Sequence, residues 1–277
     1  MKMKYLGTGA AEGIPAMFCE CKTCMEARRT AGKNIRTRSQ ALVDGKLLID
    51  FPADTYVHSI QYGINLATVK SCLITHSHSD HLYPADIEMR KPGFSHIDTL
   101  GPLTFYSGKS GCDMLKAEAE KYNVGEDRVR VEQIELFKPF KVEEYTVTAL
   151  RATHGVDTSP VVFLIERDGR TLFYSNDTSE YPSDTMDYLR TYGKHIDLLS
   201  LDCTEANGAC TYAGHLTLSR CVELVNNMKY LKIIDNDTRV VLNHFSHNGV
   251  SVLYDDFVKL AGKYGYEVSY DGMEIEI

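Results

Sequence analysis

The segment LITHSHSDH, residues 73–81, joins an apolar run typical of a buried strand to a turn that carries three histidines and an aspartate. Borderline divalent metal ions accept imidazole nitrogen and carboxylate oxygen as ligands. Without an ion, each buried donor or acceptor needs its own partner, at about 1–3 kcal/mol for each failure. The segment therefore predicts a metal site. We expect a strand to end at His76 and a helix to begin near Asp80, so that His76 and His78 approach one ion while Asp80 and His81 approach a second.

Two ions need more ligands than these four residues supply. Other polar residues also follow strand-like runs, namely His154, Asp177, Asp202 and His244. Sites in layered α/β folds tend to lie at strand ends, where a rigid sheet meets loops that leave room for a ligand. We expect His154, Asp177 and His244 to complete both sets, with the two oxygens of Asp177 as a bridge. Asp202 is expected behind a metal-binding histidine, as the acceptor that fixes its tautomer.

Short apolar runs recur along the whole chain, and no Pro/Gly/Ser-rich linker or charge block divides it. Asp44-Gly45 and Asp168-Gly169 predict β-hairpins between alternating strands. Helical periodicity predicts a helix capped by Thr217 and a later helix that ends at Gly265. The stretch GTGAAEG lacks the Gly-Lys-Ser/Thr end of a P-loop, so it predicts a tight turn after a first strand. The chain is expected to be one α/β domain, residues 1–277, with sheets inside and helices outside.

A second cluster of donors lies near the N-terminus. Cys19, Cys21 and Cys24 form a C-x-C-x2-C pattern that can supply three thiolates to a tetrahedral zinc, with redox chemistry and coincidence as alternatives. His247, three residues after His244, is the candidate fourth ligand. A zinc there would tie the N-terminal loop, at about residues 15–30, to the segment that carries His244. The other cysteines are expected to be small buried apolar residues: Cys72, Cys112, Cys203, Cys210 and Cys221.

The motif T-H-S-H-S-D-H at residues 75–81 resembles the T-H-x-H-x-D-H signature of the metallo-β-lactamase superfamily. The order of the later His, Asp and His is similar too. Tyr83, followed by Pro84, is a local departure, because many members carry a glycine two residues after the motif. The resemblance implies an αββα sandwich and a metal-dependent hydrolase. The implied ligands are His76, His78 and His154 for one ion, Asp80, His81 and His244 for the other, and Asp177 as the bridge.

The stretches GTGAAEGIPAMFCECKTC, NHFSH and YDGMEIEI resemble, more narrowly, the phosphoribosyl 1,2-cyclic phosphate phosphodiesterase family of the carbon-phosphorus lyase pathway. This resemblance implies a dinuclear centre that hydrolyses a small cyclic phosphate, and a structural zinc on the three clustered cysteines and His247. We expect Asp80 to orient the attacking hydroxide and His215 to donate a hydrogen bond or proton. An exposed residue at a helix entry is the alternative for His215.

Three function classes are open to this chain. The first is a phosphodiesterase with two active-site ions, Mn or Zn, with Fe also accepted by such ligands, beside one structural Zn. The second is another hydrolase on the same scaffold, such as a lactonase, a thioesterase or an RNA-processing nuclease, since fold and metals do not fix the substrate. The third is an accessory protein without turnover.

The formal charge of −8 argues against nucleic acid as a partner, because such binding rests on Lys and Arg neutralising phosphates. The basic run at residues 27–38 is either a solvated loop or a contact for a small anion. No apolar signal-peptide region or membrane-length run is present, so we expect a cytoplasmic location away from membranes. The expected partner is a small anionic phosphodiester, and a homodimer is left open. His58, His96 and His195 are expected to be hydrogen-bonded core or surface residues.

Overall fold

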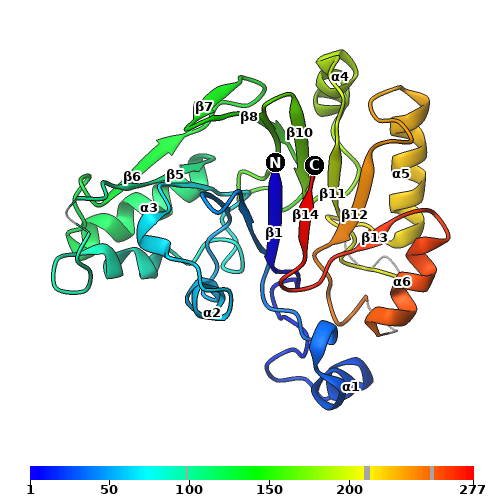
Figure 1. Ribbon diagram of the computed structural model, residues 1–277, viewed down its shortest axis with the longest axis horizontal. Helices are drawn as coiled ribbons and strands as arrows, with labels where there is room; N and C mark the ends of the chain where they lie inside the picture. The colour runs from blue at the N-terminus through cyan, green and yellow to red at the C-terminus, as the bar shows by residue number, and fades with distance from the viewer. Residues whose placement is uncertain (98, 209–212, 250–252) are drawn as a thin grey trace.

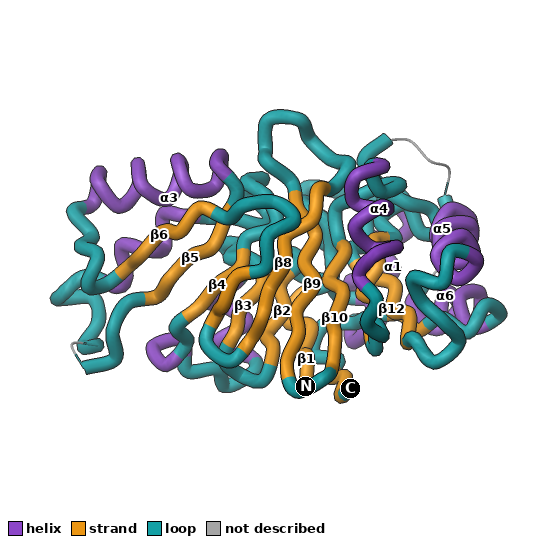
Figure 2. The backbone as a smooth tube through the Cα atoms, turned by 90° about the horizontal axis from the view of Figure 1, so that it is seen from above, coloured by secondary structure: helices purple, strands orange, loops and turns teal. Residues whose placement is uncertain are grey.

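The computed structural model describes residues 1–97, 99–208, 213–249 and 253–277. Within them, two seven-stranded sheets lie face to face, with helices on their outer faces (Figures 1 and 2). The first sheet contains β14 (Glu274–Glu276), β1 (Lys2–Gly7), β2 (Gln40–Val43), β3 (Leu47–Ile49), β4 (Ser71–Leu73), β5 (Leu103–Ser107) and β6 (Val129–Gln133), in that order. The second contains β13 (Glu267–Val268), β12 (Arg239–Asn243), β11 (Leu198–Asp202), β10 (Arg170–Ser175), β9 (Val161–Arg167), β8 (Tyr145–Arg151) and β7 (Phe140–Val142).

The two sheets are built alike. Each has antiparallel strands on one side and parallel strands, β3 to β6 or β10 to β13, on the other. The predicted hairpins are confirmed: Asp44-Gly45 joins β2 to β3, and Asp168-Gly169 joins β9 to β10. The chain returns through β14, which pairs with β1 beside the N-terminus (Figure 1). Parallel strands place their carboxyl ends along one edge, where loops can assemble a site.

Apolar side chains form three layers. On β2, Ala41 and Val43 belong to the core between the sheets, whereas Leu42 belongs to the core beneath the outer helices, as the two-residue period of a strand requires. Leu115 packs α3 onto the first sheet, and Val225 packs α5 onto the second. These layers confirm the predicted αββα sandwich of the metallo-β-lactamase type. The helices are α1 (Lys22–Thr30), α2 (Thr55–Gln61), α3 (Lys109–Tyr122), α4 (Ser183–Tyr192), α5 (Leu218–Tyr230) and α6 (Tyr254–Gly262), with 3-10 turns η1 (Gly32–Asn34), η2 (Leu66–Thr68) and η3 (Pro84–Arg90).

Two of the predicted helices form, with one change of length. Thr217 caps α5 as predicted, its hydroxyl oxygen accepting the Arg220 N–H at 3.3 Å. The later helix, α6, ends at Gly262 rather than Gly265, because Tyr264 and Gly265 donate to carbonyls three residues back, which tightens the chain. Gly265 then takes a φ of +79°, the left-handed conformation that glycine adopts without strain.

In the glycine-rich stretch after β1, the backbone passes very close to the backbone of residues 36–38. A Cβ on Gly7 would lie 2.0 Å from the Arg38 carbonyl oxygen, so glycine is required there. The predicted turn thus brings the N-terminal segment against residues 36–38, and no phosphate loop forms. Among the described residues, no helix is long and apolar enough to cross a membrane.

The scattered cysteines behave as predicted where the structure describes them. Cys72, Cys112, Cys203 and Cys221 are buried thiols, and Cys210 lies outside the described residues.

Candidate metal centre

The segment that opened the sequence leaves β4 and makes a single turn. The backbone N–H groups of His81 and Leu82 both donate to the His78 carbonyl oxygen, at 3.0 and 2.8 Å. The predicted helix near Asp80 is therefore wrong: the chain pairs next with Phe51 and begins the 3-10 turn η3 only at Pro84. Proline at this position lacks the N–H that a longer helix would need.

Three histidines form a first donor set. His76 Nε2 lies 2.9 Å from His78 Nδ1, which lies 3.1 Å from His154 Nε2. His76 and His78 follow β4 in the first sheet, whereas His154 follows β8 in the second. Gly155 leaves room for this set, because a Cβ there would lie 3.2 Å from His78 Nε2.

Asp80, His81 and His244 form a second donor set. His81 Nε2 lies 3.2 Å from both Asp80 Oδ2 and His244 Nε2. His244 follows β12, so this set too draws on both sheets. The three donor atoms lie within 4.8 Å of one another, and the side chains are buried.

Asp177 lies between the two donor sets. We call the two sets together with Asp177 the His/Asp cluster. Asp177 Oδ2 is 3.0 Å from both His81 Nε2 and His244 Nε2, and Asp177 Oδ1 is 3.7 Å from His154 Nε2. Neither Oδ2 contact has hydrogen-bond geometry, so this buried oxygen has no hydrogen-bond partner among the residues that the structure describes. A buried carboxylate oxygen that faces imidazole nitrogens without a hydrogen bond fits a bound cation.

The backbone at three strand ends is left-handed. Asp50 after β3, Asp177 after β10 and His244 after β12 have φ values of +68°, +52° and +65°. Such values are uncommon for residues other than glycine and persist where the surrounding structure enforces them. At these strand ends the side chains of Asp177 and His244 lie in the His/Asp cluster, and that of Asp50 contacts His81 from outside it.

Other residues hold the histidines from behind. His81 Nδ1 lies 2.7 Å from Asp50 Oδ2, and His244 Nδ1 lies 2.7 Å from Thr204 Oγ1. An imidazole held at Nδ1 presents Nε2 to an ion, the usual arrangement around a bound metal. Asp50 was absent from the predicted residues, although it follows a strand-like run and the strand-end rule applies to it equally.

The electrostatics of the cluster also favour a cation. Burial opposes a charge on His81, but the carboxylates of Asp177, Asp80 and Asp50 raise its pKa well above the ordinary value. Burial alone would raise the pKa of Asp177, yet His244 and His81 hold it well below. The buried carboxylates thus stabilise a positive charge within the cluster. A divalent ion can supply that charge.

His215 lies at the rim of the same cluster. Its Nδ1 is 3.0 Å from Asp202 Oδ2, and 12% of its side chain is exposed, so the predicted alternative of an exposed helix-entry residue does not fit. Burial lowers the pKa of His215, but the Asp202 carboxylate outweighs it and raises the pKa to about 9. Asp202 is thus the direct acceptor for His215. The Asp202 Oδ2 atom lies 3.8 Å from His244 Nδ1, and the Thr204 hydroxyl links the two by contacting both.

Cys19, Cys21, Cys24 and His247 come together as the Cys/His cluster. His247 Nδ1 lies 3.6 Å from Cys19 Sγ and 3.5 Å from Cys21 Sγ, and all four donor atoms fall within 4.8 Å. Cys21 caps α1 by accepting the Cys24 N–H. Burial raises the pKa of the Cys21 thiol, but the hydrogen bonds from Cys24 and His247 bring it down to about 6, which favours the thiolate that binds metal.

The basic run at residues 27–38 is neither a solvated loop throughout nor an open anion site. Arg28 donates to the carbonyl oxygens of Ala16 and Cys19, at 3.0 and 2.7 Å, and so closes the cysteine loop. Arg36 is buried and donates to Thr8 Oγ1 and the Ser269 carbonyl oxygen. Arg38 pairs with Asp54 at 3.2 Å. These side chains fasten the N-terminal segment to the sandwich.

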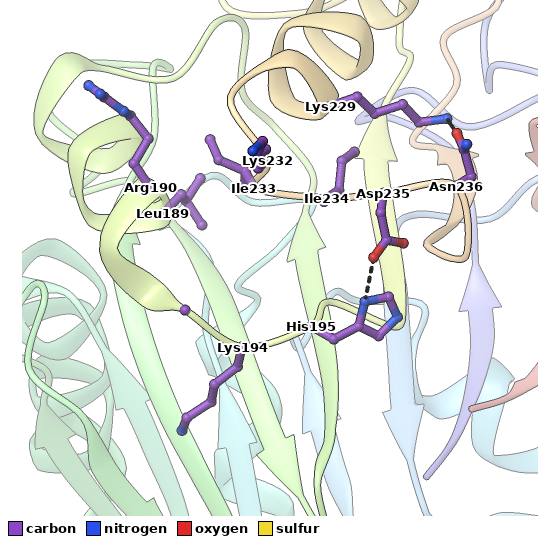
Figure 3. A pocket seen from close by; sticks show the side chains of 11 residues that line it. Leu189, Arg190, Lys194, His195, Lys229, Lys232, Ile233, Ile234, Asp235 and Asn236 are labelled. Atoms are coloured by element: carbon purple, nitrogen blue, oxygen red, sulfur yellow. Dashed lines mark hydrogen bonds and ion pairs between the residues drawn. The ribbon is translucent and has the colours of Figure 1, made fainter.

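The histidines that sequence reasoning set aside lie away from both clusters. His58 is buried between Thr37 Oγ1 and Gln40 Oε1, at 2.7 Å each, and His96 is exposed. His195 lines a cavity of about 620 Å³ at the amino-terminal ends of β11 and β12. There its Nδ1 lies 3.2 Å from Asp235 Oδ2 (Figure 3).

The His/Asp cluster opens into a cavity of about 300 Å³. The sequence analysis missed Glu12 and Asn248, which line this cavity. Both lie close to the predicted zinc ligand His247, but neither belongs to a recognisable sequence motif. The described lining residues are Ala10, Ala11, Glu12, His78, Asp80, His154, Asp177, Thr204, Glu205, His215, His244, Ser246 and Asn248.

A family model described as a beta-lactamase superfamily domain matches residues 52–245, the span that contains the whole His/Asp cluster. An octanoyltransferase of Porphyromonas gingivalis (strain ATCC BAA-308 / W83) is 25% identical over 165 residues, covering 56% of this chain and 31% of that protein. The chain thus spans about a third of the length of the curated relative it matches.

Several solved structures superpose over the whole chain. A diphosphatase from the PhnP family is 21% identical, with a TM-score of 0.76 over 100% of this chain and 98% of that one. Zinc-bound PqqB from Methylobacterium extorquens is 20% identical, with a TM-score of 0.76 over 100% of both chains. Likeness at this identity shows a shared fold.

Proposed function

The chain belongs to the beta-lactamase superfamily, and from this premise we propose that it is a dinuclear metal hydrolase acting on a small cyclic phosphodiester. The observation that carries the proposal is the position of Asp177, whose two oxygens face different donor sets. A carboxylate placed in this way can bridge two ions that act on one substrate. Phosphoribosyl 1,2-cyclic phosphate is the substrate that the sequence resemblance implies.

The residues would divide the work as follows. His76, His78 and His154 would hold one ion, Asp80, His81 and His244 the other, and Asp177 both. Two bound divalent ions supply Lewis acidity that activates water and neutralises charge in an in-line displacement at phosphorus. The Cys/His cluster would hold a structural zinc that fixes the loop beside the cavity.

Two side chains in the cavity wall would handle protons. Asp80 can accept a hydrogen bond from the attacking water and so aim its lone pair at phosphorus. His215, backed by Asp202 at 3.0 Å, can donate to the leaving oxygen as the ring opens. Asp202 holds the His215 ring in place and stabilises its positive charge.

The structural relatives support phosphate chemistry over lactone and thioester chemistry, since a diphosphatase and a human tRNase Z are among them. One superposed structure is a diphosphatase, and another is a zinc-bound protein. The octanoyltransferase gives weaker support to acyl chemistry than the diphosphatase gives to phosphate chemistry, because the match covers only 31% of the octanoyltransferase. Lactone, thioester and RNA substrates remain the comparison set for the second function class.

The test is elemental analysis of the purified protein, paired with turnover of phosphoribosyl 1,2-cyclic phosphate and of bis(p-nitrophenyl) phosphate after addition of Mn or Zn. We expect about three ions per chain and preference for the cyclic sugar phosphate. Three ions with faster turnover of a lactone or thioester would reject the phosphodiester and keep the metal centre.

Substitutions separate the hydrolase from an inactive accessory protein. Asp80→Ala and Asp177→Ala should abolish turnover while circular dichroism shows a folded chain. Asp187→Ala, at a carboxylate whose side chain is 72% exposed, is the matched control. Full activity in either cluster variant would contradict the ligand assignment.

A further inference from the structure

The glycine-rich stretch GTGAAEG lies beside the segment that follows β12. The Phe245 N–H donates to the Thr8 carbonyl oxygen at 2.9 Å, and the Ala10 N–H donates to the Phe245 carbonyl oxygen at 3.0 Å. The Gly13 N–H then donates to the Ala10 carbonyl oxygen at 2.9 Å and closes a turn that contains Glu12. This backbone pairing brings Glu12 to the residues that come directly after Phe245.

One oxygen of Glu12 meets three consecutive residues of that segment. Glu12 Oε1 accepts a hydrogen bond from the Ser246 hydroxyl and another from the Asn248 side-chain N–H, the latter at 3.4 Å. His247 Nε2 lies 3.5 Å from the same oxygen. The side chains of His247 and Glu12 are only 12% and 30% exposed, so water and salt screen their interaction only in part.

The two ring nitrogens of His247 face different partners. Nδ1 lies 3.6 Å from Cys19 Sγ and 3.5 Å from Cys21 Sγ, whereas Nε2 faces the Glu12 carboxylate. Histidines that bind a metal commonly donate the other ring N–H to a carboxylate, which fixes the tautomer and the orientation of the ring. A cation bound at Nδ1 would also draw electron density from the ring and so strengthen the attraction between the Nε2 proton and a carboxylate.

We propose that Glu12 is the positioning residue of the structural zinc site. The carboxylate favours the His247 tautomer with its proton on Nε2, which leaves the Nδ1 lone pair directed toward the cysteines. The inference rests on the zinc assignment within the proposed function and extends that site to a residue that is not a ligand. It also gives the glycine-rich stretch a role, because this stretch delivers the carboxylate to a histidine near the other end of the chain.

Cobalt is the probe for this site. Cobalt bound by thiolates absorbs strongly in the near ultraviolet, and among the described donor groups only the Cys/His cluster contains cysteine. Cobalt-substituted full-length protein is therefore titrated with a chelator, and loss of this absorption reports the affinity of the Cys/His cluster. We expect Glu12→Ala to weaken cobalt binding by about 10–100-fold. Glu12→Gln should weaken it less, because glutamine keeps an acceptor for the Nε2 proton without the charge.

Two control variants separate this role from other effects. Glu20→Ala removes a carboxylate at an exposed position inside the cysteine motif, and the affinity should stay close to native because exposed charges interact weakly. Ser246→Ala removes the hydroxyl that contacts Oε1 but keeps the carboxylate that faces His247, so its affinity should also stay close to native. A loss in Glu12→Ala no larger than the loss in either control would overturn the inference.

The same titration separates this inference from the zinc assignment. A native protein without thiolate absorption would reject the structural metal site, and the inference with it. Thiolate absorption with equal cobalt affinities in native protein and Glu12→Ala would overturn the inference alone. Turnover enters neither outcome, so failure of the hydrolase proposal would show separately, in the kinetic experiments.

Discussion

The His/Asp cluster and the Cys/His cluster are built in opposite ways. The first lies at strand ends, is largely buried, and has its imidazoles held from behind by Asp50 and Thr204. The second lies in a loop and the first turn of α1, with Cys21 exposed, and among the described residues His247 comes to it from a distant part of the chain. The fold positions the first cluster, whereas the second cluster positions a loop. We therefore expect chemistry only from ions in the first cluster, and from an ion in the second cluster a contribution to stability alone.

The sharpest test of this contrast is Asp177→Asn. Asparagine tolerates the left-handed backbone at this position, so the fold should persist while the bridging charge is lost. Turnover should fall at least about a thousandfold, since bridged ions supply several kcal/mol of stabilisation in the transition state. Steady-state kinetics and metal content per chain measure the effect. Native kinetics with a full complement of ions would show that Asp177 bridges nothing.

Cys21→Ser should act on stability instead. The variant should bind one ion fewer and lose about 4 kcal/mol of the free energy of unfolding, the value for an ion present at a thousand times its dissociation constant. Turnover should change far less. Urea unfolding with and without a chelator checks this, because the chelator should destabilise the native protein more than the variant. An unchanged ion count would mean that the cluster holds no zinc.

Asp50→Asn probes the support behind the first cluster. Without the carboxylate beside Nδ1, the His81 ring should bind its ion about 10–100-fold more weakly, as when other such supporting contacts are removed. Metal titration followed by activity measures the shift, and excess metal should restore most of the turnover. Asp54→Asn, which removes the partner of Arg38, is the matched control. Equal shifts in both variants would assign the effect to general destabilisation.

The smallest expected effect concerns His58, a buried histidine that lies outside both clusters. Burial lowers its pKa from the ordinary 6.5 to about 4. The unfolded chain then binds more protons than the folded one, so this contribution to stability is complete above about pH 6.5 and is lost as pH falls toward 4.

His58→Gln should therefore flatten the fall in the free energy of unfolding between about pH 7.5 and 5 by about 2 kcal/mol. Urea unfolding across this range measures it, with His96→Gln at an exposed position as the control. Parallel curves for native protein and His58→Gln would mean that His58 titrates normally in the fold.

Much of the candidate site could be predicted because its donors share a local signal. His76, His78, Asp80 and His81 lie within six residues, and the other donors each follow an apolar run. The sandwich itself follows from alternating apolar residues and from the Asp-Gly turns.

What could not be predicted depends on contacts distant in sequence. The left-handed backbone at Asp50 and His244 is uncommon for residues other than glycine, and no local sequence signal predicts it. Glu12 lies 234 residues from its partner Ser246. The contacts of Asp202 depend on such positions too: a strand-end rule places its carboxylate behind a histidine, and the structure shows that it contacts His215 directly and reaches His244 through the Thr204 hydroxyl.

Each donor set takes side chains from both sheets, and this has a consequence for the lifetime of the protein. An ion bound by residues of both sheets would link the two sheets through its metal–ligand bonds. Opening of the sandwich would therefore require release of the ion. Susceptibility to proteases would then follow the supply of metal in the surroundings. A shortage of metal would thus lower the amount of folded protein as well as its turnover.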